Sequence, residues 1–371
     1  MRTANLSFRS RKVGTEIRLQ GITRRFGQTL AVDNLSLTIA PGEFVTLLGA
    51  SGSGKTTTLM MVGGFIEPSA GRIVLGGKDV TDMPPAKRDL GVVFQNYSLF
   101  PHLSVARNLA FPLEMRGEPQ HTIRKKVADA LDMVQLADKS HRLPHELSGG
   151  QQQRIALARA LIFEPQALLM DEPLGALDKK LREYMQIEIK RLHTSSGCTV
   201  LFVTHDQEEA LTLSDRVAVM QDGRIAQIDS PRFLYERPET RWVAEFIGQS
   251  NFIGGRVHEV QANGYDVTLD SGESVSGKGV KNLACGQQVC AVLRPEKIRL
   301  AASGVLPVKA IVTDVLYLGH TVKVTLRLTD GTTLRVQAQN IDLETPLMTG
   351  RAVSVGWRPE DLWFIAGEQG Q

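Results

Sequence analysis

The chain of 371 residues has little cysteine, no long apolar run and almost no excess of charge. No apolar stretch approaches the roughly 18 residues that cross a bilayer, and the N-terminus lacks the apolar core of a signal peptide. The chain is therefore expected to stay in the cytosol, where it can still dock on a membrane protein. Three cysteines fit that compartment. Cys285 and Cys290 lack metal-site spacing and a nearby histidine, so all three are expected to be ordinary thiols.

The formal net charge of +3 is too small to indicate a nucleic-acid-binding protein, and no nucleic-acid partner is expected. The one local excess of basic residues, RSRKVGTEIR, is interpreted as part of a flexible N-terminus over residues 1–15. Apolar residues make up 42% of the chain and charged residues 22%, which is ordinary for a globular protein. This length predicts two or three domains with a substantial core.

Residues 16–240 combine short apolar runs with longer helical patterns. The runs include EFVTLLG, GVVFQ, ALLMD and TVLFVT, and the helical patterns cover 122–136, 151–162 and 180–195. Runs that are apolar throughout suit strands buried on both faces. This part of the chain therefore predicts an α/β domain with a parallel sheet and helices on each side.

Residues 241–371 follow a different pattern, in which polar and apolar residues alternate, as in TVKVTLRL and RAVSVGW. Turn pairs such as Asp330-Gly331 separate the runs, which predicts a small all-β domain of the barrel type. VLRPEKIRL at 292–300 resembles GWRPEDLWF at 356–364, and this repeat indicates two related β units.

The segment GASGSGKTT fits the phosphate-loop pattern G-x-x-x-x-G-K-[ST], between a predicted strand and a predicted helix. Its glycines let backbone amides turn toward phosphate oxygens, Lys55 can reach the outer phosphates, and the Thr56 hydroxyl can bind Mg²⁺. A merely flexible glycine turn is the alternative, which the strand–loop–helix context disfavours. The candidate nucleotide-binding residues of the loop are Gly49, Ala50, Ser51, Gly52, Ser53, Gly54, Lys55, Thr56 and Thr57.

Polar side chains also follow the ends of three other predicted strands. Asp171 ends ALLMD and can hold Mg²⁺, and Glu172 follows it and can polarise the attacking water. Gln95 ends GVVFQ, where it is a candidate metal ligand and catalytic residue. His205 follows TVLFVT and can donate a hydrogen bond to the γ-phosphate. Because ligands bind beyond the carboxyl ends of parallel strands, we expect these residues and the phosphate loop to lie together.

Phe26 precedes this core and can stack on adenine, although a packing role is nearly as consistent with the residue alone. A second candidate phosphate binder lies in LSGGQQQR at 147–154, where a hydroxyl residue and two glycines open a predicted helix. Its candidate nucleotide-binding residues are Ser148, Gly149, Gly150 and Gln151.

Taken in order, the phosphate loop, Gln95, LSGGQ, LLMDE, GALD and His205 resemble the ATP-binding-cassette ATPases over roughly residues 16–240. The resemblance implies a P-loop nucleoside triphosphatase with a RecA-like core and a helical subdomain at about 96–165. It also implies ATP and Mg²⁺ as cofactors, with Lys55, Gln95, Glu172 and His205 as catalytic residues. The β-rich tail is similar to the OB-like TOBE extension of the bacterial importers.

The same resemblance explains why one chain carries two phosphate binders. In that family two subunits pair head to tail around two ATP molecules. Ser148, Gly149 and Gly150 of one subunit would face the γ-phosphate held by Lys55 of the other, and Asp178 would lie at the same interface. A homodimer is therefore expected, in which hydrolysis opens the pair and drives a mechanical cycle.

The expected assembly is peripheral, on the cytoplasmic face of the bacterial inner membrane. Its partners would be two integral membrane permease subunits and, through them, a periplasmic or extracellular solute-binding protein. The segment after Gln95, with Tyr97, Leu99, Phe100 and Leu103, is expected to form the groove that contacts the permease; local core packing is the alternative.

The sequence resembles the polyamine importers most closely, so uptake of putrescine and spermidine is expected. Ferric iron, sulfate, sugar and aminoethylphosphonate are alternative cargoes of the same mechanism. A soluble cassette ATPase acting on nucleic acid or ribosomes is an alternative of a different class, disfavoured by the single cassette and the lack of a basic stripe. A small-molecule kinase is a third alternative, and the LSGGQ segment would have no role in such an enzyme.

Overall fold

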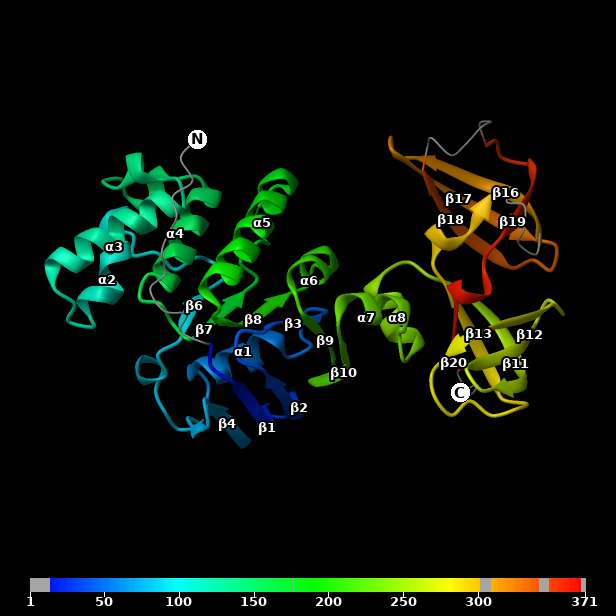
Figure 1. Cartoon of the computed structure of the whole chain (residues 1–371), viewed down its shortest axis with the longest axis horizontal. Coiled ribbons are helices and arrows are strands. Elements are labelled where there is room, and N and C mark those ends of the chain that lie inside the picture. Colours follow the sequence, from blue (N-terminus) through cyan, green and yellow to red (C-terminus); the bar gives the residue numbers. More distant parts are fainter. Residues whose placement is uncertain (1–13, 176, 301–307, 340–346, 368–371) are drawn as a thin grey trace. The chain divides into compact units, whose positions relative to one another are not determined.

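The computed structural model describes residues 14–175, 177–300, 308–339 and 347–367 (Figure 1). Contacts divide the chain into two compact units, Met1–Pro231 and Arg232–Gln371. The expected domain limits at residues 15 and 240 stay predictions, and most of the N-terminal segment lies outside the described residues.

The first unit is built around a six-stranded sheet in the order β10-β9-β3-β8-β7-β6. Its strands are β3 (Phe44–Gly49), β6 (Gly91–Val93), β7 (Ala167–Asp171), β8 (Thr199–Thr204), β9 (Arg216–Gln221) and β10 (Arg224–Asp229). Neighbouring strands pair in parallel except β9 with β10. All residues of β3, β7 and β8 are buried, as expected for apolar runs covered on both faces. The predicted parallel sheet is confirmed.

Alternate side chains of these strands pack into two separate cores. Leu47 and Leu169 point to one face, which is covered by helix α1 (Lys55–Gly63) and a four-stranded sheet in the order β2-β1-β4-β5. The strands of this sheet are β1 (Ile17–Phe26), β2 (Thr29–Ile39), β4 (Ala70–Leu75) and β5 (Lys78–Asp79). Phe44 and Met170 point to the other face, covered by α4 (Gly149–Leu161), α5 (Lys179–Ser196) and α6 (Gln207–Leu213).

Helix α4 also packs against α2 (Val105–Glu114) and α3 (Gln120–Met133) around a third core, within the range expected for the helical subdomain. Short 3₁₀ helices connect these parts: η1 (Pro85–Lys87), η2 (Ala137–Lys139) and η3 (Pro144–Glu146).

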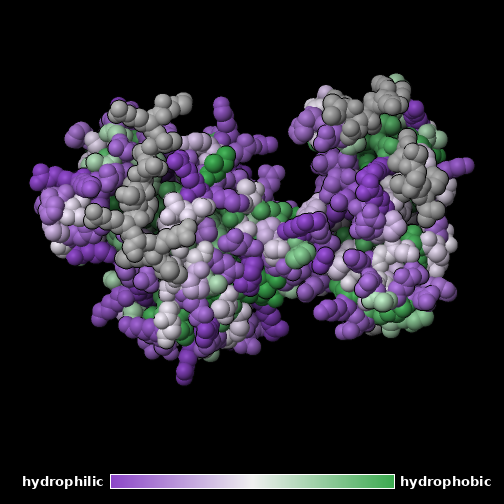
Figure 2. Space-filling view, viewed as in Figure 1, coloured by the Kyte–Doolittle hydropathy of each residue, from purple (hydrophilic) through white to green (hydrophobic). Residues whose placement is uncertain are grey.

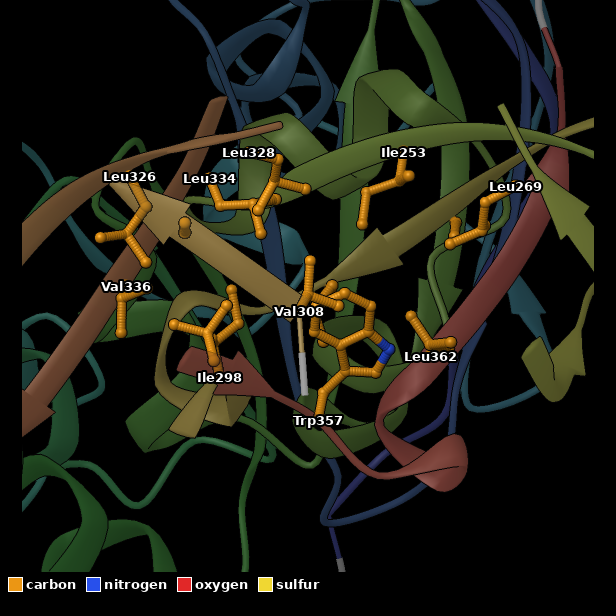
Figure 3. Close-up of a cluster of buried hydrophobic side chains, with 14 of the residues drawn as sticks. Ile253, Leu269, Ile298, Val308, Leu326, Leu328, Leu334, Val336, Trp357 and Leu362 are labelled. Carbon is orange, nitrogen blue, oxygen red and sulfur yellow. The ribbon is translucent and has the colours of Figure 1, made fainter. Parts of the chain in front are cut away.

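Helix α7 (Pro231–Glu236) starts at the boundary between the two units, and the second unit continues with α8 (Arg241–Ile247) and two sheets. A closed barrel contains β11 (Asn251–Gln261), β12 (Gly264–Leu269), β13 (Ser274–Gly279), β14 (Gln288–Leu293) and β20 (Leu362–Ala366). A five-stranded sheet contains β15 (Arg299–Leu300), β16 (Val308–Tyr317), β17 (Thr321–Leu328), β18 (Thr333–Gln339) and β19 (Ala352–Gly356). Side chains from both sheets share one core around Trp357 (Figure 3). The predicted all-β barrel-type domain is confirmed.

The two RPE sequences lie where the chain crosses between these sheets. Each opens a 3₁₀ helix, η4 (Pro295–Lys297) or η6 (Pro359–Asp361). Arg294 is buried, stacks on the Tyr235 ring at 3.9 Å and donates hydrogen bonds to the carbonyl oxygens of Tyr235 and Ala244. The first RPE therefore holds α7 and α8 against the barrel, a structural role.

Truncating Leu326 to alanine should destabilise the second unit by about 2–5 kcal/mol, because this fully buried side chain would leave a cavity in the shared core. All three tryptophans, Trp242, Trp357 and Trp363, lie in this unit, so their fluorescence during urea unfolding reports on it selectively. The control is Arg327→Ala, which changes the adjacent, exposed residue of the same strand. Equal unfolding midpoints for the two variants would contradict this assignment of the core.

Candidate nucleotide-binding and catalytic site

The loop between β3 and α1 requires glycine at two positions. Gly52 and Gly54 have φ angles of 82° and 97°, which residues with a Cβ rarely adopt. A Cβ on Gly54 would also collide with the carbonyl oxygen of Ala31. The loop leads directly into the first turn of α1, whose unpaired backbone N–H groups favour an anion.

Lys55 is the first residue of α1 and is almost fully buried, with 5% of its surface exposed. Its ammonium group donates hydrogen bonds to the carbonyl oxygens of Gly49 and Ala50, both at 2.8 Å. Burial lowers the pKa of Lys55, and the carboxylates of Glu172 and Asp171 oppose this effect. The ammonium is thus folded back onto its own loop, with two carboxylates near it.

The loop residues fit a bound phosphate group. The buried hydroxyl of Ser53 has no hydrogen-bond partner within the described part of the chain. A buried hydroxyl without a partner is costly, and a phosphate oxygen is a suitable acceptor for it.

Thr56 and Asp171 meet at the carboxyl end of β7. The Thr56 hydroxyl donates a 2.9 Å hydrogen bond to an Asp171 carboxylate oxygen, and Asp171 is 5% exposed. Burial raises the pKa of Asp171, the hydrogen bond from Thr56 lowers it, and the neighbouring Glu172 raises it. A hydroxyl and a carboxylate at one point form a hard oxygen donor set, which is what Mg²⁺ prefers.

Glu172 lies beside Gln95 and His205, which were predicted to follow the ends of two other strands. One carboxylate oxygen is 3.1 Å from His205 Nδ1 and accepts a hydrogen bond from the Gln95 side-chain amide at 3.4 Å. Glu172 has a φ of 43°, and its N–H donates to the carbonyl oxygen of Val203 on β8. This backbone turn directs the carboxylate toward Gln95 and His205. In this structure Gln95 contacts Glu172, and no hydrogen bond joins it to Thr56 or Asp171 within the described residues.

The LSGGQ segment forms the start of α4, as expected. Ser148 is the N-cap, and its hydroxyl and backbone N–H exchange hydrogen bonds with Gln151 at 3.4 and 3.0 Å. In the described part of the chain, no hydrogen bond joins this helix start to residues 49–57. The structure therefore shows no hydrogen bond between the described residues of the two phosphate binders of one chain.

The two glycines of this segment differ in their surroundings. A Cβ on Gly149 would meet open space, whereas a Cβ on Gly150 would collide with the Leu181 side chain of α5. The physical reason for Gly150 is therefore close packing of α4 on α5, which the sequence argument did not include.

Two further expected residues lie at the ends of other elements. Phe26, the last residue of β1, is 44% exposed, and the Arg24 guanidinium lies over its ring at 4.6 Å. Asp178 is exposed and caps α5, where its carboxylate accepts a hydrogen bond from the Leu181 N–H at 3.0 Å.

Tyr97 does not line a groove on the surface. Its ring belongs to the core beneath α4 and α5 with 8% exposure, so the core-packing alternative holds for this residue. Leu99, Phe100 and Leu103 are half-buried.

Sequence reasoning missed Arg182, whose guanidinium lies between the loop that ends at Asp178 and the segment after His205. A signal was present, because Arg182 follows the capping Asp178 by one helical turn and so lies on the same side of α5.

Hydrophilic side chains cover most of the visible face of each unit, and hydrophobic residues form small separate groups (Figure 2). Among the helices of the described ranges, none combines the length and the apolar character that a membrane-spanning segment requires.

The sheet, the glycine loop and the strand-end carboxylates define a P-loop nucleotide-binding protein. Residues 32–175 match the ABC transporter family, and residues 291–365 match the TOBE domain. The chain is 47% identical to the spermidine/putrescine import ATP-binding protein PotA of Rubrobacter xylanophilus, over 95% of this chain and 94% of that one. The protein of the same name from Pseudomonas aeruginosa is 46% identical, over 92% of this chain and 96% of its own.

Solved structures agree with these sequence relatives. A dimeric post-hydrolysis structure of the ATP-binding cassette MJ0796 with ADP and Pi matches with a TM-score of 0.54 and 33% identity. The match covers 58% of this chain and 99% of that one. The chain belongs to the family of ABC transporter ATP-binding proteins that these relatives represent.

Replacing Lys55 by alanine should weaken ATP binding by at least about tenfold, because a charge-assisted contact contributes about 1.5–3 kcal/mol. Calorimetric titration with ATP measures this change. Lys87→Ala removes an exposed lysine of η1 and should leave the affinity unchanged. An unaltered Kd for the Lys55 variant would exclude this lysine from the phosphate site.

Proposed function

We propose that the chain hydrolyses ATP to energise uptake of putrescine and spermidine through a separate membrane permease in a bacterium. The observation that carries the proposal is the geometry at one sheet edge, where Thr56 is bonded to Asp171 and Glu172 lies beside Gln95 and His205. It is supported by 46–47% identity to spermidine/putrescine import ATP-binding proteins over nearly the whole chain.

In this proposal the phosphate loop, residues 49–57, holds the β- and γ-phosphates through its backbone N–H groups, the Ser53 hydroxyl and the Lys55 ammonium. To reach ATP, Lys55 exchanges its two loop carbonyls for phosphate oxygens. Phe26 stacks on the adenine with its exposed ring face.

Thr56, Asp171 and Gln95 are the residues that would hold Mg²⁺. Mg²⁺ would offset the negative charge that develops on the phosphate oxygens. For Gln95 this role requires its amide to turn away from Glu172, with its oxygen toward Thr56 and Asp171.

Glu172 orients the attacking water and accepts its proton, since its carboxylate lies beyond Asp171 at the open edge of the sheet. His205 donates a hydrogen bond to the γ-phosphate and, through Nδ1, keeps Glu172 in place. Catalysis then consists mainly of positioning and charge stabilisation.

Two copies of the chain complete the site. The α4 start makes no bond to residues 49–57 of its own chain, and its open Gly149 leaves the backbone accessible. We assign Ser148, Gly149, Gly150 and Gln151 to the γ-phosphate held by Lys55 of a second copy. Asp178 lies at the same interface. The dimeric state of the MJ0796 cassette supports the pairing of two copies.

The homodimer would sit peripherally on the cytoplasmic face of the inner membrane, bound to two permease subunits. A periplasmic or extracellular solute-binding protein would deliver the polyamine to the permease. Leu99, Phe100 and Leu103, half-buried after Gln95, would supply apolar contact to the permease, while Tyr97 supports them from the core. No nucleic acid takes part.

Cells that carry Glu172→Gln should lose uptake of labelled putrescine and spermidine, because ATP binds but the water is not activated. Uptake of polyamines, ferric iron, sulfate, maltose and aminoethylphosphonate is compared with cells carrying the unaltered chain. Glu183→Gln, the same change at an exposed position of α5, is the control. If uptake of a different solute were lost instead, the assigned cargo would change and the importer mechanism would stand. Unchanged uptake of every solute would contradict the importer proposal.

Replacing Ser148 by arginine should abolish ATP-dependent dimerisation, because a large cation at the α4 start blocks approach of the second copy. Each subunit should still bind ATP with the affinity of the unaltered chain. Sedimentation of the Glu172→Gln background with and without ATP measures dimer formation. Ser195→Arg adds the same charge at an exposed position near the end of α5 and should leave dimerisation intact. A dimer that persists in the Ser148 variant would refute the assigned role of α4.

A further inference from the structure

The first turn of α5 contacts the LGALD loop, the LSGGQ helix and the segment after β8. Asp178 caps this helix at the end of the LGALD loop, and Leu181 packs on Gly150 of the LSGGQ helix. Arg182 is the next residue of the same turn. A displacement of this turn therefore affects both elements that are proposed to face the second copy.

The Arg182 guanidinium bridges this turn and the segment that follows β8. Nη2 donates a 3.1 Å hydrogen bond to the carbonyl oxygen of Leu177, and Nη1 donates a 3.1 Å hydrogen bond to the Asp206 carboxylate. Nε lies 3.7 Å from a carboxylate oxygen of Glu209, whose side chain is 2% exposed. A planar guanidinium presents donors in fixed directions, so it can hydrogen-bond the Leu177 carbonyl and the Asp206 carboxylate at once, while Glu209 is a more distant ion-pair partner.

The two neighbours of His205 are both fixed in this network. Asp206 caps α6 by accepting from the N–H groups of Glu208 and Glu209, and its own N–H donates to the Thr204 hydroxyl at 3.0 Å. The Thr204 hydroxyl in turn donates to Glu209 at 2.6 Å. Burial raises the pKa of Glu209, and the Thr204 hydrogen bond and the Arg182 charge oppose that effect.

His205 itself is poorly constrained by packing, with 58% of its side chain exposed. Its ring nevertheless lies 3.1 Å from Glu172. The backbone on both sides of His205, held by Thr204 and Asp206, is therefore what places the ring.

We propose that Arg182 is a positioning residue that ties the LGALD loop to the His205 segment and so aligns His205 with Glu172. The inference rests on the proposed ATPase function. Through this tie, docking of a second copy at Asp178 and Ser148 is transmitted to the pair that activates water. Arg182 acts through its hydrogen bonds to Asp206 and the Leu177 carbonyl.

Arg182→Met, which keeps an unbranched side chain as far as the position of Nε and removes the donors, tests this role. We expect kcat for ATP hydrolysis to fall by about 10- to 100-fold, since a small misplacement of catalytic groups has effects of that size. The KM for ATP should stay within about twofold, because the phosphate loop is untouched. Arg182→Lys, which can make one of the two hydrogen bonds, should recover part of kcat.

Arg191→Met is the matched control, because Arg191 lies on the same helix, is 69% exposed and pairs with Glu188 at the long distance of 4.0 Å. It should retain the kcat of the unaltered chain. Asp206→Asn removes the ion pair but retains a good N-cap for α6, so it should lower kcat even if the Arg182 variants fold poorly.

The double variant Arg182→Met/Asp206→Asn should lower kcat no more than Arg182→Met alone, because both changes break the same connection. The inference would be overturned if the losses of kcat multiplied in the double variant. It would also be overturned by an unchanged kcat in Arg182→Met or Asp206→Asn, or by an equal loss of kcat in Arg191→Met. Absence of hydrolysis in the unaltered chain would instead contradict the proposed function.

Discussion

The parallel pairing of β8 with both β3 and β7 is the constraint on which the site depends. These three buried strands run side by side in the same direction, so the segments after them emerge at one edge. The phosphate loop follows β3, Glu172 follows β7 and His205 follows β8. The direction of the strands therefore brings together residues that are far apart in the sequence.

Local backbone conformation then determines which way each group points. Positive φ angles at Gly52 and Gly54 shape the phosphate loop, and a positive φ at Glu172 turns its carboxylate toward Gln95 and His205. Only glycine adopts such angles easily. At Glu172 a larger residue accepts a less favourable conformation, stabilised by the hydrogen bond of its N–H to Val203 on β8. Strain at this position fits a group that has to reach past the sheet edge toward a substrate.

The sequence was most informative where a pattern has a local physical cause. The apolar runs predicted β3, β7 and β8 because strands buried on both faces contain few polar residues. Glycine spacing predicted the loop before α1, and Ser148 predicted the start of α4 because hydroxyl side chains cap helices. The assembly at the sheet edge followed from the direction of the strands.

Contacts between distant segments were not predictable in this way. Arg182, Gly150 and Arg294 each depend on which helix or strand lies opposite, and no local pattern names that partner. Tyr97 misled the sequence argument for the same reason, since an aromatic residue in a polar segment can face either the core or the surface. Its burial under α4 is a consequence of tertiary packing.

The central claim is that two copies share each ATP, one through Lys55 and the other through the start of α4. The most direct test is a structure of the Glu172→Gln variant with ATP and Mg²⁺. The account predicts a γ-phosphate in hydrogen-bond contact with Lys55 of one subunit and with Ser148 or the backbone N–H groups of Gly149 and Gly150 of the other. A γ-phosphate contacted by the residues of a single subunit, with the second α4 start remote from it, would contradict the account.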